Sequence, residues 1–195
     1  MPLPLTTDLL TVMLEEYAER LDLYADMDAN VEGLTTISAT TRPFVRINRY
    51  LSMVPARTNR FRSTLAHELY HLVYHAPYYQ EKSRQGDLFN KAAAEIVCLR
   101  GTILGAKKVD WREWQAAYGA GALLMPRIAL QQVIREQSDI YELPPYMEES
   151  QAADAVIVLI ATCFEVSREA AAVRLWQKGF LRAAADGHQF TLFGG

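Results

Sequence analysis

The chain has 195 residues, of which 50% are hydrophobic, and this is enough for one compact domain with a substantial core. Its 20 basic and 23 acidic residues give a net charge of −3, which excludes a general attraction to nucleic acid or to an anionic membrane. The longest apolar stretch, residues 155–164, is far shorter than the roughly 20 residues that span a bilayer, and the N-terminus lacks a signal-peptide pattern. Two distant cysteines, Cys98 and Cys163, favour reduced thiols. We therefore expect a soluble, cytoplasmic protein.

The N-terminal part of the chain predicts an amphipathic helix followed by a β-hairpin. Apolar residues recur near helical spacing in residues 7–23, with acidic residues between them. Two β-prone runs, residues 34–38 and 44–48, flank a Thr-rich turn that contains Pro43. The expected fold class is therefore α+β, mostly helical, with a small sheet packed on helices.

The next helix is predicted over residues 63–75, a run without helix breakers. Ser63 is its expected N-cap and Pro77 its expected end. The polar and aromatic residues 78–91 then predict a surface loop beside this helix.

The C-terminal half predicts a series of helices. The expected segments are residues 92–106, 111–124, 127–137, 150–164 and 167–178, with Asp110 as the N-cap of the second and a tight turn before the last. Two prolines at 144–145 interrupt the series. We expect a main domain over residues 1–148 and a C-terminal helical extension, resembling a helix-turn-helix, over residues 149–195, packed on the same core.

The most informative motif is His-Glu-x-x-His, formed by His67, Glu68 and His71. On a helix, residues four apart share a face and lie about 6 Å apart along the axis, so both imidazoles can reach one metal ion with Glu68 beside it. Neutral imidazoles suit Zn²⁺, and a neighbouring carboxylate can take a proton from water whose pKa the ion lowers to roughly 7. The motif is the signature of zinc peptidases and predicts hydrolysis of a peptide bond.

A catalytic zinc site usually has three protein ligands, so the chain must supply one more. His75 lies eight residues after His67, about 12 Å further along a straight helix, and we expect it to have a structural or surface role. His188 lies in a Gly- and Ala-rich tail, where solvent exposure is the simpler expectation. The third ligand is therefore expected to be a carboxylate.

The order of these pieces resembles the ImmA/IrrE-type metallopeptidases. The matching segments are residues 22–26, residues 59–68, a Glu-x-x-Ala motif at 113–116 and Leu-Leu-Met-Pro at 123–126, within a resemblance that covers about residues 7–180. The resemblance implies a metal site of His67, His71 and Glu113, with Glu68 as the general base. It also implies that the substrate is a protein, a helix-turn-helix repressor of a prophage, mobile element or stress regulon. Zinc is the expected metal, and manganese also fits this ligand set.

Three features depart from the pattern of that family. Tyr70 stands where a glycine is usual, and its ring is expected near the ligand face, where it would line or narrow the cleft. The long gap between His71 and Glu113 leaves Glu95 as a rival ligand, although only Glu113 has the Glu-x-x-Ala context. Ala117 replaces a frequent Asn or Asp, so the hydrogen bond that orients a ligating histidine must come from elsewhere.

Two other classes of function remain open at this stage. One is a peptidase-like regulatory module that binds its repressor, or DNA, without cleavage. The other is a DNA-binding regulator that uses the C-terminal helices and keeps the metal for structure. The last helix offers only Arg168, Arg174 and Lys178 as basic residues, so direct binding of nucleic acid is not expected.

Overall fold

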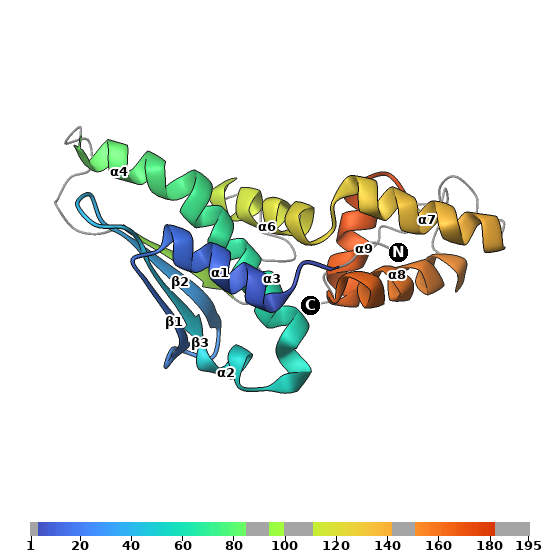
Figure 1. Ribbon diagram of the computed structural model, residues 1–195, viewed down its shortest axis with the longest axis horizontal. Coiled ribbons are helices and arrows are strands. Elements are labelled where there is room, and N and C mark those ends of the chain that lie inside the picture. Colours follow the sequence, from blue (N-terminus) through green and yellow to red (C-terminus); the bar gives the residue numbers. More distant parts are fainter. Residues whose placement is uncertain (1–3, 85–93, 100–110, 142–150, 182–195) are drawn as a thin grey trace. The chain divides into compact units, whose positions relative to one another are not determined.

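The structure is a computed structural model that describes residues 4–84, 94–99, 111–141 and 151–181 (Figure 1). The chain divides into two compact units, one of Leu5–Ala120 and one of Gly121–Gly195 together with Met1–Pro4. The first, here the N-terminal unit, holds a sheet and the long helix that carries the His-Glu-x-x-His motif; the second, here the C-terminal unit, is helical in its described part. The predicted α+β, mostly helical class is confirmed.

The first helix, α1 (Thr7–Tyr17), is shorter than predicted. It begins at Thr6, whose side-chain hydroxyl accepts a hydrogen bond from the Leu9 backbone N–H at 3.2 Å, as an N-cap does. Its apolar face buries Leu10 and Leu14 completely.

The prediction of helix as far as residue 23 was wrong, because strand β1 (Arg20–Ala25) follows α1. Leu21 and Leu23 lie two apart, which is the spacing of a strand. β1 pairs in parallel with β3, so its backbone hydrogen bonds come from residues that are distant in sequence. Only this tertiary pairing decides between helix and strand in this segment.

A mixed sheet of four strands has the order β1-β3-β2-β4. The predicted hairpin is confirmed as β2 (Val31–Ile37) and β3 (Phe44–Asn48), which pair antiparallel. β4 (Ala94–Leu99) pairs antiparallel with β2 on its other side. The helix predicted over residues 92–106 was therefore wrong where it is described, since an apolar run that includes the β-branched Ile96 and Val97 suits a sheet; the remainder of that segment lies outside the described residues.

The helical region between β3 and β4 is longer than predicted at both ends. It comprises α2 (Arg49–Ser52), the 3₁₀ turn η1 (Pro55–Arg57), α3 (Thr58–Tyr70), the π-helical turn η2 (His71–His75) and α4 (Ala76–Arg84). Ser63 is not an N-cap: it lies inside α3, and its hydroxyl donates a hydrogen bond to the Asn59 carbonyl at 3.0 Å.

Pro77 does not end the helix, so the loop predicted from residue 78 was wrong as far as residue 84, and the rest of that loop lies outside the described residues. Proline interrupts a regular α-helix because it lacks an N–H and its ring collides with a carbonyl four residues earlier. Here the π-helical turn changes the hydrogen-bond register just before the proline, with the Ala76 N–H bonded to the His71 carbonyl five residues back. The changed register accommodates Pro77 near the start of α4.

α3 packs on the sheet and on α1, and this contact forms the core of the N-terminal unit (Figure 1). Val45 and Ile47 alternate along β3 and are fully buried, as is Leu65 of α3. Burial of each such side chain stabilises the fold by about 1.5–3 kcal/mol, so the sheet fixes the position of the motif helix firmly.

The C-terminal unit follows the predicted helices closely. Its helices are α7 (Arg127–Tyr141), α8 (Gln151–Phe164) and α9 (Arg168–Gln177), and the boundary with the N-terminal unit falls within α6 (Trp111–Leu124). Ser167 caps α9 by accepting a hydrogen bond from the Ala170 N–H at 3.1 Å. The predicted N-cap Asp110 lies outside the described residues.

The basic residues of the last helix do not form a free cationic face. Arg174 is buried and donates a hydrogen bond from Nε to the Met125 carbonyl at 3.2 Å. Arg168 lies 3.6 Å from Asp154.

Among the described helices, none has the length and apolar character needed to cross a membrane.

Candidate metal centre

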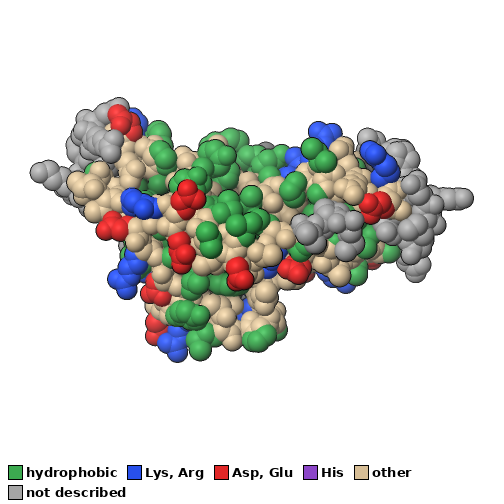
Figure 2. All heavy atoms as spheres, in the orientation of Figure 1, with side chains coloured by type: hydrophobic (Ala, Val, Ile, Leu, Met, Phe, Trp, Pro, Cys, Tyr) green, Lys and Arg blue, Asp and Glu red, His purple; other side chains and the backbone are tan. Residues whose placement is uncertain are grey.

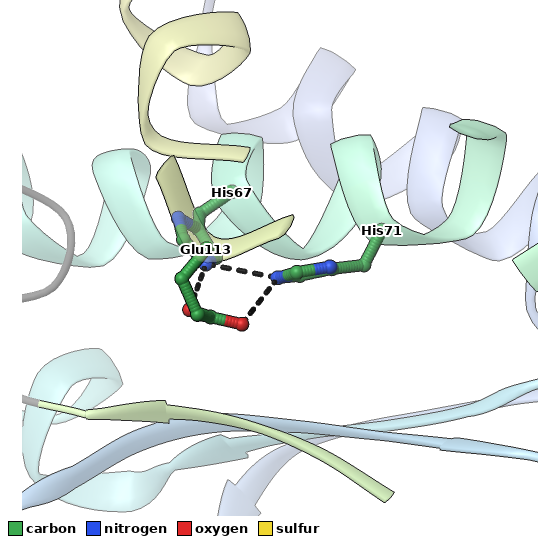
Figure 3. Close-up of side chains that lie close together, drawn as sticks. All are labelled: His67, His71 and Glu113. Atoms are coloured by element: carbon green, nitrogen blue, oxygen red, sulfur yellow. Dashed lines mark hydrogen bonds and ion pairs between the residues drawn. The ribbon is translucent and has the colours of Figure 1, made fainter. Parts of the chain in front are cut away.

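The structure brings His67, His71 and Glu113 together, although the third residue comes from a different helix. His67 lies in the last turn of α3, His71 opens the π-helical turn, and Glu113 lies in the first turn of α6. One nitrogen or oxygen atom from each residue lies within 4.8 Å of those from the other two. Figure 3 shows the three polar ends converging on one point.

The distances within this cluster suit one tetrahedral metal ion. His71 Nε2 lies 3.0 Å from His67 Nε2 and 3.3 Å from Glu113 Oε1, and His67 Nε2 lies 3.1 Å from Glu113 Oε2. Ligand atoms about 2.0–2.1 Å from a tetrahedral zinc ion are separated from one another by about 3.3 Å. The side chains are therefore arranged as a metal site requires, and the donor set of two imidazoles and one carboxylate fits a catalytic zinc ion.

The cluster is buried. His67 and His71 are 0% exposed and Glu113 is 6% exposed. In the space-filling view, no imidazole is visible among the coloured side chains on the face shown (Figure 2). Buried polar groups must be paired to offset the loss of hydration, so such a concentration in the core is costly unless the groups bind one another or an ion.

The charge states of Glu113 and His71 are those of metal ligands. Burial by itself raises the pKa of Glu113, but hydrogen bonds from His67 and His71 and the positive charge that these rings can carry lower it to about 2. Burial lowers the pKa of His71 to about 4. At neutral pH the carboxylate is therefore ionised and the His71 ring is neutral, which leaves their lone pairs available to a cation.

Glu68 does not point into the cluster but lies against strand β2. Its Oε2 accepts a hydrogen bond from the Thr35 hydroxyl at 2.5 Å, and its Oε1 is buried without a hydrogen-bond partner among the described residues. A Cβ atom on Gly33 would overlap Glu68 Oε1, so glycine at this position leaves room for the carboxylate.

The environment of Glu68 suits a group that exchanges protons near neutral pH. Complete burial raises its pKa to about 7, against the lowering effects of the His67 charge and of the hydrogen bond from Thr35. A general base works best when its pKa lies near the operating pH. Sequence reasoning identified Glu68 but missed Thr35 and Gly33, because their pairing with it depends on the sheet.

His75 was expected to have a structural or surface role, and the structure shows it buried and hydrogen-bonded to His71 and Gln115. It is buried and lies outside the cluster, but its Nδ1 lies 2.7 Å from Nδ1 of His71. Its Nε2 lies 3.1 Å from Oε1 of Gln115 on α6. His75 is thus a hydrogen-bond partner of His71. The four-residue spacing from His71 was a readable signal for this contact.

Tyr70 packs towards α6. Its ring occupies the space beside Gly119, where a Cβ atom would overlap it. The ring also lies 4.5 Å from the ring of Tyr74 and 5.4 Å from that of His75, measured between centroids. Burial raises the pKa of Tyr70, with a further contribution from Tyr74. Gly119 on α6 therefore leaves the space that the ring of Tyr70 fills.

The side chains of the two remaining candidates, Glu95 and His188, lie outside the described residues. Glu95 lies on strand β4, where its backbone is opposite Thr36, and not on a helix as predicted.

Comparison with known families agrees with the fold and the site. The model of the IrrE N-terminal-like domain, peptidase family M78, matches residues 18–176, which include the sheet, the motif helix and Glu113. A comparison with curated proteins gave no match. Because the family model covers most of the chain and the cluster has the ligands of a metallopeptidase, the chain belongs to the ImmA/IrrE family of metallopeptidases.

Proposed function

We propose that this protein is a zinc-dependent endopeptidase in which His67, His71 and Glu113 hold the metal and Glu68 is the general base. The observation that carries the proposal is the convergence of three buried ligand atoms within 4.8 Å of one another, with Glu68 next to His67 on α3. Manganese remains compatible with the same ligand set, and the neutral imidazole pair favours zinc.

A zinc ion at these ligands supplies Lewis acidity, which polarises a carbonyl group and makes water acidic near pH 7. A residue of the chain then transfers the proton. Glu68 takes the proton of the attacking water on its Oε1, the carboxylate oxygen left free by Thr35, and returns it to the amine of the departing peptide. In the metal-free protein burial raises the pKa of Glu68 to about 7, and a pKa in this range suits a group that both accepts and donates a proton. Gly33 and Thr35 hold this carboxylate in place.

We further propose that the substrate is a cytoplasmic protein, a helix-turn-helix repressor of a prophage, mobile element or stress regulon. The support for this substrate is the membership of the chain in its family. The basic residues Arg168 and Arg174 are engaged within the C-terminal unit, which favours a protein partner over direct binding to DNA.

The test is incubation of the purified, zinc-loaded protein with a helix-turn-helix repressor encoded beside its gene, where the neighbouring genes include one. We expect two fragments with one defined junction by mass spectrometry, none after removal of the metal with a chelator, and recovery when zinc is restored. A protein that binds zinc and the repressor yet produces no fragments would replace this proposal with the regulatory module that acts without cleavage.

A further inference from the structure

A chain of hydrogen bonds runs outward from the metal cluster through side chains that none of the roles above requires. It starts at Nδ1 of His71, continues 2.7 Å to Nδ1 of His75 and ends with the 3.1 Å contact between His75 Nε2 and Gln115 Oε1. The chain links the π-helical turn to α6, the helix that also supplies Glu113.

The chemistry of the ring nitrogens allows only one arrangement of protons when His71 binds a metal. A neutral imidazole that uses Nε2 as a ligand carries its proton on Nδ1, so His71 must donate to His75. His75 then accepts on Nδ1 and carries its own proton on Nε2. That proton faces the carbonyl oxygen of Gln115, which is an acceptor. Each group in the chain finds the partner that it needs.

The local structure holds this arrangement rigidly. His75 is 7% exposed, and the ring of Tyr70 packs on it edge to face at 5.4 Å. His71 and His75 are the first and last residues of the π-helical turn, and their ring centroids lie 4.9 Å apart. An acceptor fixed in this way restricts the rotation of the His71 ring as well as its tautomer.

We propose that His75 and Gln115 are positioning residues that hold His71 as the Nδ1–H tautomer, with the lone pair of Nε2 directed into the cluster. The inference rests on the proposed function in requiring that His67, His71 and Glu113 bind a metal. Partners of this kind raise the basicity of the ligand and orient its ring, and their loss typically weakens metal affinity by about 10- to 100-fold.

The test compares two replacements of His75 that separate hydrogen bonding from packing. His75→Phe keeps the ring volume and removes the acceptor, whereas His75→Asn is smaller but places an amide oxygen near the former Nδ1. Zinc affinity is measured by competition with a chromophoric chelator. We expect His75→Phe to bind zinc about 10- to 100-fold more weakly than the parent, and His75→Asn to stay within about threefold of it. A residue needed only for packing gives the reverse order, and that order would overturn the inference.

Gln115 gives an independent variant at a half-buried position. Gln115→Leu removes the acceptor of the His75 proton and should weaken zinc binding several-fold, whereas Gln115→Glu keeps an acceptor and should not. Equal zinc affinity of Gln115→Leu and the parent would contradict the role proposed for the hydrogen bond between His75 and Gln115.

Nitrogen NMR of the imidazoles in the zinc-loaded parent supplies a readout that does not depend on activity. We expect His75 to be protonated at Nε2 and not at Nδ1; a proton on Nδ1 of His75 would refute the proposed arrangement. A parent protein that binds no zinc would defeat the proposed function as well. A parent that binds zinc as described but cleaves nothing would leave the positioning role intact and remove only the peptidase activity.

Discussion

Glu68 and Gly33 are in direct contact: the carboxylate of the motif helix occupies the space that a side chain on strand β2 would fill. Together with the 2.5 Å hydrogen bond from Thr35, this contact fixes the carboxylate beside the cluster without making it a ligand. The sheet is therefore part of the catalytic apparatus in this account, because it sets the position of the proposed base.

Replacement of Gly33 by alanine should displace Glu68 and leave the three ligands in place. We expect zinc content to stay near that of the parent while cleavage falls by a factor on the order of 10². Gly121→Ala is the matched control, since a Cβ atom there meets only Arg174 Cδ at an ordinary 3.8 Å. Elemental analysis and the rate of repressor cleavage measure the two effects. Full activity in Gly33→Ala would show that the contact does not position the base.

Gly119 and Tyr70 should be energetically coupled. Gly119→Ala alone forces the tyrosine ring out of its place and should lower the free energy of unfolding by about 1–3 kcal/mol. In a Tyr70→Ala background the same substitution meets no ring and should be neutral or stabilising by up to about 1 kcal/mol, because alanine favours a helix more than glycine does. The free energy of unfolding is measured by denaturant unfolding for the parent, the two single variants and the double variant, which together form a double-mutant cycle. Additive effects would contradict the packing described.

The metal-free protein should lose stability as Glu68 ionises. The pKa of Glu68 is about 7 in the folded protein, above its usual value of 4.5. Between these values the unfolded chain releases the proton while the folded protein keeps it, so the folded state becomes less stable as pH rises from 4.5 through 7. The side chain of Glu68→Gln does not titrate. The free energy of unfolding of this variant, relative to that of the parent, should therefore rise by about 3 kcal/mol between pH 4.5 and pH 8. A difference that stays constant with pH, measured by urea unfolding, would exclude the raised pKa.

The identity of the third ligand can be tested with a matched pair of isosteric variants. Glu113→Gln removes the charge that lies 3.1 and 3.3 Å from the two imidazoles, and it should lower zinc affinity by at least 10-fold. Glu95→Gln is the control and should bind zinc as the parent does. Loss of zinc in Glu95→Gln, with retention in Glu113→Gln, would reverse the assignment.

The motif was readable in the sequence because its geometry is local. The four-residue spacing of His67 and His71 puts them on one face of any helix, whatever the rest of the fold does. Glu113 was found through the order of motifs along the chain, since no local rule connects it with a histidine on another helix. β1 was missed for a similar reason: its hydrogen bonds come from β3, and its residues alone do not distinguish a helix from a strand.

His75 was placed outside the metal cluster correctly, but its contact with His71 was overlooked. Eight residues along a straight helix put His75 too far from His67 to share its metal ion, and that distance says nothing about the neighbouring His71. The same four-residue rule that joins His67 to His71 also joins His71 to His75. The π-helical turn and the continuation of the helix through Pro77 had no comparable signal, because they depend on a hydrogen-bond register that only the folded helix reveals.

The central claim is that Glu68 moves the proton while His67, His71 and Glu113 hold the metal. The most direct test measures zinc content and repressor cleavage for the parent and for Glu68→Gln in parallel. The variant keeps the size of the side chain, so it should bind one zinc ion per chain and still bind the repressor, while the rate of cleavage falls by a factor on the order of 10² or more. A Glu68→Gln protein that contains zinc and cuts the repressor as fast as the parent would contradict the account.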